Sequence, residues 1–239
     1  MNADSYIAII GAKDEEIDEY SKHLHNLSAT KWHDYVFLTG DLFGKKVVLT
    51  ETGIGKVHAA LITQKVIDEY KPTALIFTGL AGGLNNEFEI GDILVSNDLI
   101  QHDFRAHPQF PKYTIPKSNG KDTFHIFLPD KDLKERALSY KTTAHKVRAG
   151  RILTGDQFLS RSEMNKYAHL IEELHGDAVE MEGAAVAQVC TINQLPFVVI
   201  RTISDKADNN ANVDFKAFLP IAAKNSIGMV RHILESLSV

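Results

Sequence analysis

Carboxyl groups follow apolar runs at several places in the chain, where they could carry out acid–base chemistry. Residues 14–16 read Asp-Glu-Glu and follow the apolar run 6–11. Residues 180–182 read Glu-Met-Glu, and Asp205 follows the apolar run 196–204. General acids and bases in enzymes are often carboxyl groups whose surroundings set their protonation state. These residues are therefore the first candidates for catalysis.

Two of these acidic positions also have a purely structural interpretation. Acids that open a helix offset its dipole, which would account for residues 14–16. The alternative is that one of them acts as a general base in a cleft. An aspartate at position 205 can cap a helix or a turn, or it can meet a ligand at the end of a strand. The residues alone leave both pairs of alternatives open.

Glu180 and Glu182 precede an alanine-rich stretch at 183–190, which predicts a buried helix. Carboxylates that enter such a helix need partners, because a buried unpaired charge is costly. One possible partner is Arg201, which lies inside the apolar run 196–204. Another is the hydroxyl pair of a bound sugar. Spacing does not choose between them.

A glycine-rich run, TGLAGGL at 78–84, follows a short apolar stretch. Glycines at such a place either form a tight turn or let the backbone approach a ligand closely. The run matches neither a Walker A loop nor a dinucleotide fingerprint. It therefore predicts no cradle for nucleotide phosphates.

The eleven histidines and the single cysteine show no metal-binding spacing, so we expect neither a metal nor another cofactor. Cys190 lies in the alanine-rich stretch and is expected to be an inert packing residue. Tyr6, Phe37 and Phe77 are likewise expected in the core rather than against a cofactor.

One cysteine permits no internal disulfide, which is typical of a reducing compartment. The short apolar run near the N-terminus does not resemble a signal peptide, and we expect a cytoplasmic protein.

Composition favours an ordinary globular protein. The 239 residues are 44% hydrophobic and 24% charged, with a formal net charge of −5. A mild acidic balance argues against nucleic acid or an anionic membrane as partner. No run approaches the roughly 18 apolar residues that a spanning helix needs. We expect one domain covering residues 1–239.

The order of the expected elements predicts the fold class. Apolar runs alternate with helical patterns, which predicts an α/β protein with a central mixed sheet flanked by helices. A long loop is expected at 103–126, which carries several prolines. Ligands of such sheets bind where strands end, which directs attention to the candidates above. The expected strands are 6–11, 35–39, 46–52, 74–79, 92–96, 145–154, 178–180 and 196–204, and the expected helices are 56–70, 130–139, 163–174, one starting near 182, and 215–237.

Taken together, these segments resemble the methylthioadenosine/S-adenosylhomocysteine nucleosidases, a family with the fold of the purine nucleoside and uridine phosphorylases. Each matching segment is weak alone, but they occur in the family's order and span most of the chain. The most specific are VEMEG and RTISD. The matching segments are IAIIGAKDEE at 7–16, TGIGKVHAA at 52–60, TGLAGGL at 78–84, IGDILVS at 90–96, TGDQF at 154–158, AVEMEGAAVAQVC at 178–190 and PFVVIRTISDKAD at 196–208.

The resemblance implies hydrolysis of the N-glycosidic bond of 5′-methylthioadenosine or S-adenosylhomocysteine, as in nucleoside catabolism and methionine salvage. Glu16 matches the acid that activates the attacking water, and Asp205 matches the acid that protonates adenine at N7. Ser204 matches the neighbour that orients this acid. The family is homodimeric, and a partner's loop, here about 103–116, closes part of the pocket for the 5′ group.

The resemblance also implies a set of substrate-binding residues. Glu182 matches the carboxylate that binds the ribose hydroxyls, and Met181 the side chain beneath the sugar. Phe158 matches the ring stacked on adenine, and Leu159 the position whose backbone reads the edge of adenine. Arg201 matches the arginine that braces the acidic cluster. The complete set is Ile54, Leu80, Ala81, Gly82, Phe158, Leu159, Glu180, Met181, Glu182, Arg201, Ser204 and Phe215.

Three features depart from the family's pattern and concern the substrate range. Family members often have methionine at the position of Lys13 and serine at that of Leu80, and the loop at 103–116 is atypical. The sequence therefore does not rank methylthioadenosine, S-adenosylhomocysteine, 5′-deoxyadenosine and 6-amino-6-deoxyfutalosine. Two other functions stay open on the same scaffold: a purine nucleoside phosphorylase that uses phosphate, and a nucleoside-binding protein without catalysis.

Overall fold

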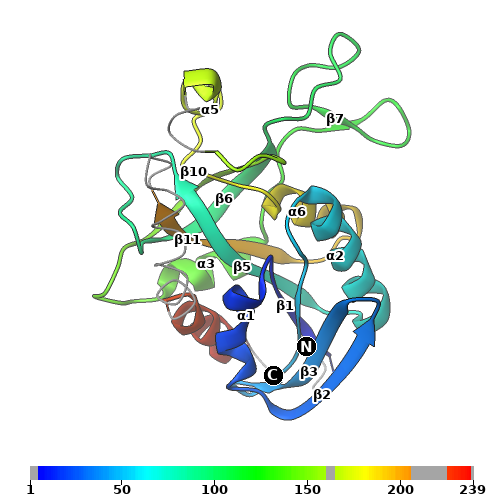
Figure 1. The fold of residues 1–239 in the computed structure, drawn as a ribbon, viewed down its shortest axis with the longest axis vertical. Helices are drawn as coiled ribbons and strands as arrows, with labels where there is room; N and C mark the ends of the chain where they lie inside the picture. The colour runs from blue at the N-terminus through cyan, green and yellow to red at the C-terminus, as the bar shows by residue number, and fades with distance from the viewer. Residues whose placement is uncertain (1–4, 160–164, 206–224, 238–239) are drawn as a thin grey trace.

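Nine strands form one mixed sheet at the centre of the computed structural model, which describes residues 5–159, 165–205 and 225–237 (Figure 1). The strand order is β10-β9-β6-β11-β5-β1-β4-β3-β2. The apolar, β-branched composition of the central strands suits burial on both faces. In chain order the strands are β1 (Ile7–Gly11), β2 (His25–Trp32), β3 (Tyr35–Leu42), β4 (Lys45–Glu51), β5 (Ala74–Gly83), β6 (Ile93–Gln101), β9 (Val147–Thr154), β10 (Ala178–Glu180) and β11 (Phe197–Asp205).

The short strand β10 closes one part of this sheet on itself. It pairs in parallel with β9 and, on its other side, antiparallel with the end of β5. The strands β5, β11, β6, β9 and β10 therefore form a ring of hydrogen-bonded neighbours. This ring brings the end of β10 against the strand ends of β5 and β11.

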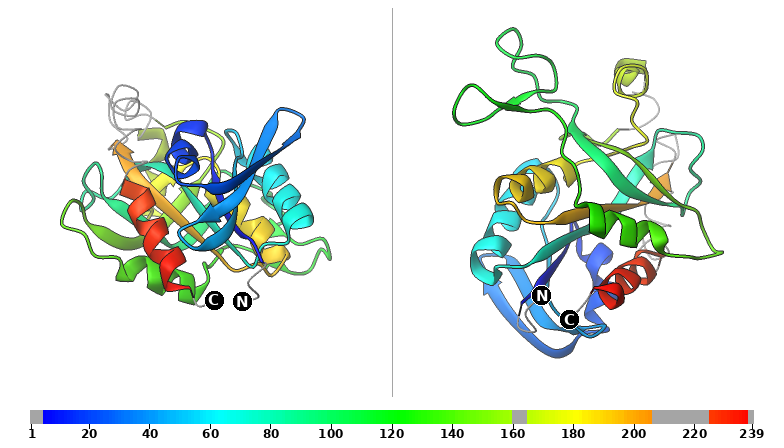
Figure 2. Two further views of the ribbon diagram at one scale, coloured as in Figure 1. Left: turned by 90° about the horizontal axis from the view of Figure 1, so that it is seen from below. Right: turned by 180° about the vertical axis from the view of Figure 1, so that it is seen from behind.

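Helices cover both faces of the sheet because successive strand residues point to opposite sides. Ile10 and Phe77 pack in the cluster that contains the buried faces of α2 (Lys56–Tyr70) and α6 (Gly183–Ile192). Their neighbours Ile9 and Ile76 pack in the opposite cluster. That cluster contains α1 (Asp14–Ser21), α3 (Lys131–Ser139) and the C-terminal helical residues 225–236, and Figure 2 shows the two helical layers.

A third, smaller cluster lies at the end of the molecule that carries α5 (His169–Glu172). It joins Leu159, Leu170 and Val179 to the ends of β6 and β9. Nearby, β7 (Ile115–Pro116) and β8 (Thr123–Phe124) form a small separate hairpin that projects from the body in Figure 1. A 3₁₀ turn at Asn165–Tyr167 precedes α5.

The predicted fold class is confirmed, and most predicted elements are present. The strands β5 and β6 extend several residues beyond the predicted 74–79 and 92–96, because sheet pairing continues past the apolar runs. The loop 103–126 contains the two-residue strands β7 and β8. Phe37 and Phe77 are buried as predicted, whereas Tyr6 is half-buried against the core.

One predicted helix is shorter in the structure, and another lies partly outside the described residues. The helix predicted at 163–174 is short, since only His169–Glu172 are α-helical within the described residues. The predicted helix at 215–237 is present over 225–236, and its residues 215–224 lie outside the described part. No helix of the described residues is both long and apolar enough to span a membrane.

Candidate active site

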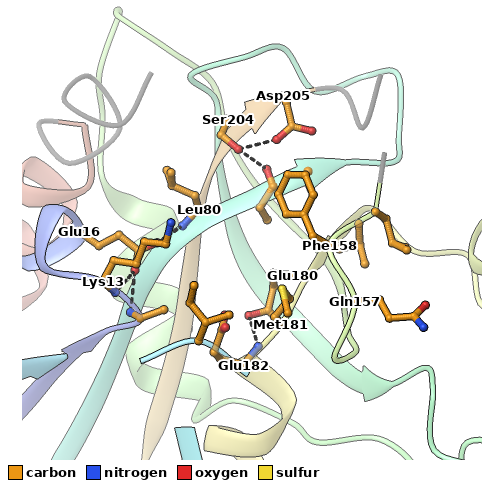
Figure 3. Close-up of a pocket in the computed structure, with 16 residues that line it drawn as sticks. Lys13, Glu16, Leu80, Gln157, Phe158, Glu180, Met181, Glu182, Ser204 and Asp205 are labelled. Carbon is orange, nitrogen blue, oxygen red and sulfur yellow. Dashed lines mark hydrogen bonds between the residues drawn. The ribbon is translucent and has the colours of Figure 1, made fainter. Parts of the chain in front are cut away.

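A pocket of about 900 Å³ opens where the parallel strands of the sheet end (Figure 3). Loops that follow β1, β4, β9 and β10 contribute to it, as do the ends of β5 and β11. Carboxyl ends of parallel strands are the usual ligand sites of α/β sheets. The lining residues are Ala12, Lys13, Glu16, Ile54, Leu80, Ala81, Gly82, Gln157, Phe158, Leu159, Val179, Glu180, Met181, Glu182, Ser204 and Asp205.

Glu16 in the first turn of α1 is fixed by backbone donors from two elements. Its Oε2 accepts hydrogen bonds from the backbone N–H groups of Ala12 at 2.6 Å and Lys13 at 3.0 Å. Its Oε1 accepts from the N–H of Leu80 in β5 at 3.1 Å. The carboxyl group thus joins the start of α1 to the end of β5.

The close approach of Glu16 to β5 requires a glycine in the strand. A Cβ atom built at Gly79 would lie 2.8 Å from Oε1 of Glu16, which is closer than real contacts allow. Burial raises the pKa of Glu16, while the charge of Arg201 and the three backbone donors oppose that rise. A carboxylate with a raised pKa is a stronger base than an ordinary surface glutamate.

Asp205 enters the pocket at the end of β11, just after an irregularity in the sheet. Ile203 pairs with Ala81 and Asp205 with Gly82, so Ser204 is an extra residue in the register. Such a bulge changes the direction of the following side chain. The hydroxyl group of Ser204 donates a hydrogen bond of 2.7 Å to Oδ2 of Asp205, and both residues are buried (Figure 3).

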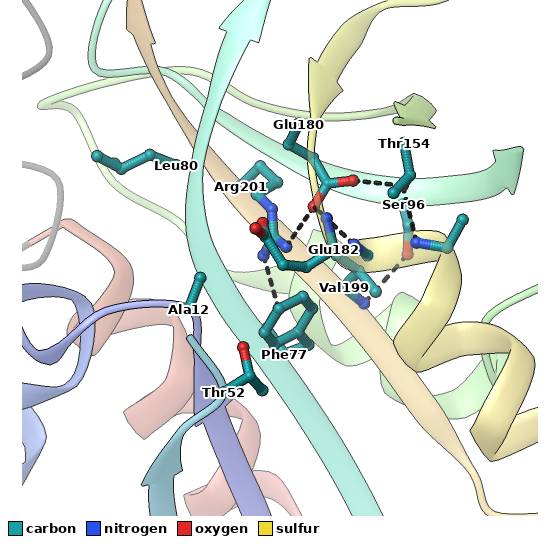
Figure 4. Close-up of polar contacts among 12 residues, drawn as sticks. Ala12, Thr52, Phe77, Leu80, Ser96, Thr154, Glu180, Glu182, Val199 and Arg201 are labelled. Carbon is teal, nitrogen blue, oxygen red and sulfur yellow. Dashed lines mark hydrogen bonds and ion pairs between the residues drawn. The ribbon is translucent and has the colours of Figure 1, made fainter. Parts of the chain in front are cut away.

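A buried ion pair lies beneath the pocket and joins β10 to β11 (Figure 4). Nη2 of Arg201 lies 2.7 Å from Oε2 of Glu180, and the two side chains are 1% and 3% exposed. The same oxygen accepts from the backbone N–H of Glu182 at 3.1 Å and of Gly183 at 2.7 Å. The other oxygen accepts from the hydroxyl of Thr154 in β9. The guanidinium of Arg201 also lies 4.2 Å from the ring centre of Phe77.

Glu182 is the N-cap residue of α6, and its side chain lines the pocket. Its Oε1 accepts a hydrogen bond of 2.8 Å from the backbone N–H of Gly55. Burial raises the pKa of Glu182 to about 8, and the nearby charge of Glu180 adds to this rise. The Gly55 donor and the charge of Arg201 act in the opposite direction. The chemistry suited to such a carboxyl is binding hydroxyl donors, which compensate its burial.

Aromatic and aliphatic side chains form the other side of the pocket. In Figure 3, Phe158 and Gln157 lie across the pocket from Glu16 and Lys13. The Phe158 side chain is half exposed, whereas Leu159 is buried in the third apolar cluster. A flat ring beside a cavity can stack on a planar ligand.

The structure brings together nearly all of the predicted site residues. Arg201 does not line the pocket, but it pairs with Glu180, which does, and its charge opposes the rise in the pKa of Glu16 and of Glu182. Phe215 lies outside the described residues. Three further residues line the pocket without having been predicted from the sequence: Ala12, Gln157 and Val179. The one feature of the sequence that could have predicted them is that they lie within four residues of Glu16, Phe158 and Glu180.

The residues that depart from the family's pattern take different positions. Lys13 and Leu80 line the pocket, both on the side of Glu16 (Figure 3). Within the described residues, none of the loop 103–116 lines the pocket of its own chain. No group of three His, Cys, Asp or Glu side chains among these residues is arranged to hold a metal ion.

The arrangement places two separately held carboxyl groups in one cavity. Glu16 is bonded by backbone amides and Asp205 by a hydroxyl, while Glu182 offers a third carboxyl group. Differently held carboxyl groups can hold different protonation states, which is the requirement for paired acid and base catalysis. The chemistry that fits is cleavage of a bond between a planar group and a hydroxyl-bearing ring.

Comparison with known proteins gives a consistent result. The model of the phosphorylase superfamily matches residues 6–235. A 5′-methylthioadenosine/S-adenosylhomocysteine nucleosidase of Shewanella sediminis is 39% identical over 234 residues, which are 97% of this chain and 99% of the relative.

Two solved structures are similar over nearly the whole chain. The Neisseria meningitidis 5′-methylthioadenosine/S-adenosylhomocysteine nucleosidase, in complex with methylthio-immucillin-A, is similar with a TM-score of 0.88 and 34% identity. The comparison covers 98% of this chain and 100% of that one. The Helicobacter pylori futalosine hydrolase is similar with a TM-score of 0.89 and 31% identity, covering 99% and 100%.

The raised pKa of Glu182 predicts how stability depends on pH. Between about pH 4.5 and 8 the folded chain retains a proton on Glu182 that the unfolded chain has released. This group therefore makes the free energy of unfolding fall as pH rises, by up to about 1.4 kcal/mol per pH unit. The variant Glu182→Gln should lose that part of the slope and be more stable than the wild type at pH 8. Urea denaturation at pH 5, 6, 7 and 8 measures it, and parallel curves for the two proteins would contradict the prediction.

Proposed function

Since the chain belongs to the 5′-methylthioadenosine/S-adenosylhomocysteine nucleosidases of the phosphorylase superfamily, we propose that it hydrolyses the N-glycosidic bond of 5′-substituted adenine nucleosides. The products are adenine and the 5-substituted ribose. The observation that carries this proposal is the shared pocket of Glu16 and Asp205. Their carboxyl groups face one cavity, together with a ring and a third carboxyl group suited to the two halves of a nucleoside.

We place an adenine nucleoside in the pocket in the following orientation. Phe158 stacks on the adenine ring, and Asp205 faces its N7 atom. Glu182 accepts hydrogen bonds from the ribose hydroxyls, and Met181 lies beneath the sugar. Glu16 then lies beside C1′, where water attacks. The 5′ group lies at the open part of the pocket, which the chain's own loop 103–116 does not line.

The reaction begins at the base, because adenine is a poor leaving anion. Asp205 donates its proton to N7, and Ser204 holds the carboxyl in place through Oδ2. The electrons of the C1′–N9 bond move into the adenine ring, and positive charge develops on the sugar. Glu16 takes a proton from water as the oxygen bonds to C1′. The carboxylate of Glu16 stabilises the developing positive charge, and the carboxyl oxygens of Glu182 hold the ribose hydroxyls.

A phosphorylase on this scaffold is disfavoured by the charge of Glu16. Phosphate would have to bind where water attacks, beside this buried carboxyl. Two like unit charges 4 Å apart repel by about 4 kcal/mol at an effective dielectric constant of 20. Lys13 offsets part of this repulsion from the same side of the pocket. A nucleoside-binding protein without catalysis would need neither Glu16 nor Asp205.

Dependence on phosphate separates these three functions. Incubation with 5′-methylthioadenosine in phosphate-free buffer should release adenine at a rate that added phosphate does not raise, because water is the nucleophile. Adenine is measured by chromatography, and the other product identifies the nucleophile as water or phosphate. Release only in the presence of phosphate would establish phosphorolysis, and tight binding without release would establish a binding protein.

Removing the proton donor tests the role of Asp205. The variant Asp205→Asn should keep the fold but lower turnover of 5′-methylthioadenosine by about 10²–10⁴-fold, the usual contribution of a positioned acid. Steady-state kinetics measure kcat, and a thermal melt verifies folding. A matched control is Asp132→Asn, which removes an exposed carboxyl on α3. Near-native turnover of a folded Asp205→Asn protein would remove this residue from the mechanism.

We also infer a homodimer that lies in the cytoplasm, where the single thiol stays reduced. Apolar side chains are exposed beside the pocket at Ile54, Val57 and Leu61, and Val57 is 78% exposed. Val57 and Leu61 are four residues apart on α2, so they share one face of the helix. The resemblance to the family implies that a second copy would bring its loop 103–116 to the pocket for the 5′ group.

Light scattering tests this association. The wild-type chain should have twice its 26.6 kDa mass in solution, and Val57→Asp should shift it toward the monomer, because a charge replaces apolar contact. Lys131→Asp, at an exposed position on α3 away from this face, is the control. A wild-type mass of one chain at micromolar concentration would contradict the dimer.

A further inference from the structure

Three charged side chains outside the pocket lining form a cluster at its rim, which we call the rim cluster: Lys56, Asp103 and Asp156. Nζ of Lys56 lies 2.5 Å from Oδ1 of Asp103 and 3.5 Å from Oδ2 of Asp156. The remaining oxygens are also used. Oδ2 of Asp103 accepts from the backbone N–H of Asp156 at 2.9 Å, and Oδ1 of Asp156 accepts from the backbone N–H of Lys56 at 2.9 Å.

The rim cluster joins three segments that are far apart in sequence. Lys56 is the first residue of α2, Asp103 follows the end of β6, and Asp156 follows the end of β9. Two of them are close in sequence to pocket residues. Asp156 lies two residues before Phe158. Lys56 follows Gly55, whose N–H donates to Glu182. The cluster therefore reaches the two ends of the pocket that bind the base and the sugar.

The start of α2 explains why carboxylates gather here. The first N–H groups of a helix have no partner within the helix, and they attract negative charge. Gly55, the N-cap residue, has no side chain to supply a cap. The acceptors come instead from other segments, Glu182 for the N–H of Gly55 and Asp156 for that of Lys56. A displacement of Asp156 or of α2 would therefore also displace Glu182, the residue proposed to bind the ribose hydroxyls.

Partial burial distinguishes these contacts from ordinary surface pairs. The Lys56 side chain is 16% exposed, compared with 29% for Asp103 and 50% for Asp156. Burial alone would raise the pKa of Asp103, but the bond from Lys56 and the amide of Asp156 hold it below its ordinary value. The ion pair is therefore formed at neutral pH.

We propose that Lys56, Asp103 and Asp156 are positioning residues that hold Phe158 against the base and, through the N-terminus of α2, hold Glu182 against the ribose. The proposal rests on the proposed function of the pocket. None of the three touches the reacting atoms. Their loss affects groups that bind the non-reacting parts of the nucleoside, so it raises KM more than it lowers kcat.

Kinetics of matched variants test the rim cluster. Lys56→Met should raise the KM for 5′-methylthioadenosine about tenfold, since small misplacements of binding groups are costly, with a smaller change in kcat. Lys56→Arg, which keeps the charge, should restore most of the affinity. The control Lys65→Met breaks the pair with Glu69 on the same helix and should leave KM within about twofold, because neither residue lines the pocket.

Two further measurements separate positioning from stability alone. Asp103→Asn combined with Lys56→Met should raise KM no more than the worse single variant, because the residues act in one network. Discrimination against a 2′-deoxy substrate should weaken in Lys56→Met, because Glu182 loses its fixed orientation. A change in melting temperature without either effect would mean that the rim cluster only stabilises the fold.

The failure of this proposal can be distinguished from failure of the proposed function. If the wild type hydrolyses the nucleoside and folded Lys56→Met has an unchanged KM, the rim cluster has no positioning role and the function stands. If the wild type releases no adenine, the proposed hydrolysis fails. Calorimetric titration with adenine then decides the positioning role, since Lys56→Met should bind adenine more weakly than Lys65→Met. Equal affinities, or a wild type that does not bind adenine, would overturn it.

Discussion

The buried ion pair between Arg201 and Glu180 is the interaction on which the rest of the site depends. Arg201 lies in the middle of the sheet, where an unpaired charge would cost several kcal/mol. Glu180 satisfies it and uses its remaining acceptor capacity on the hydroxyl of Thr154 and on two amides at the start of α6. One carboxylate thus fixes β9, β10, β11 and α6 relative to each other. Because the ring of strands places β10 against β5, the ends of all these elements meet at the pocket.

Several acidic side chains line the pocket with little compensating charge. Their burial lowers the stability of the fold but serves the proposed catalysis. Burial raises the pKa of Glu16 and of Glu182. Stability alone would favour apolar residues at these positions. The amide donors hold the carboxyl group of Glu16 in one orientation. Its raised pKa also makes it a stronger base than a carboxylate in water. Preorganised groups of this kind need no rearrangement during the reaction, which is the main source of electrostatic stabilisation in enzymes.

Helix starts carry a large part of this arrangement. Glu16 lies in the first turn of α1, Glu182 is the N-cap of α6, and the amides of Gly55 and Lys56 at the start of α2 bind two carboxylates from other segments. Unpaired amides at helix N-termini attract carboxylates. The attraction between helix N-termini and carboxylates therefore contributes both to the acidic pocket and to the contacts at its rim. The positions of the binding residues depend in this way on the positions of whole helices.

The sequence by itself determined the α/β fold class, the positions of most strands and helices, and the place of Glu16 and Asp205 at strand ends. These follow from apolar periodicity and from chain order, which are local properties. Only the tertiary structure decided that Arg201 pairs with Glu180 and leaves Glu182 to the pocket, that the exposed strand β2 joins the sheet edge, and that Lys56 meets Asp103 and Asp156. The ion pair and the contacts of Lys56 depend on closure between segments that are up to 123 residues apart, and such contacts are set by packing rather than by local sequence. Strand β2 pairs locally with β3, but its exposed side chains leave no apolar pattern that predicts a strand.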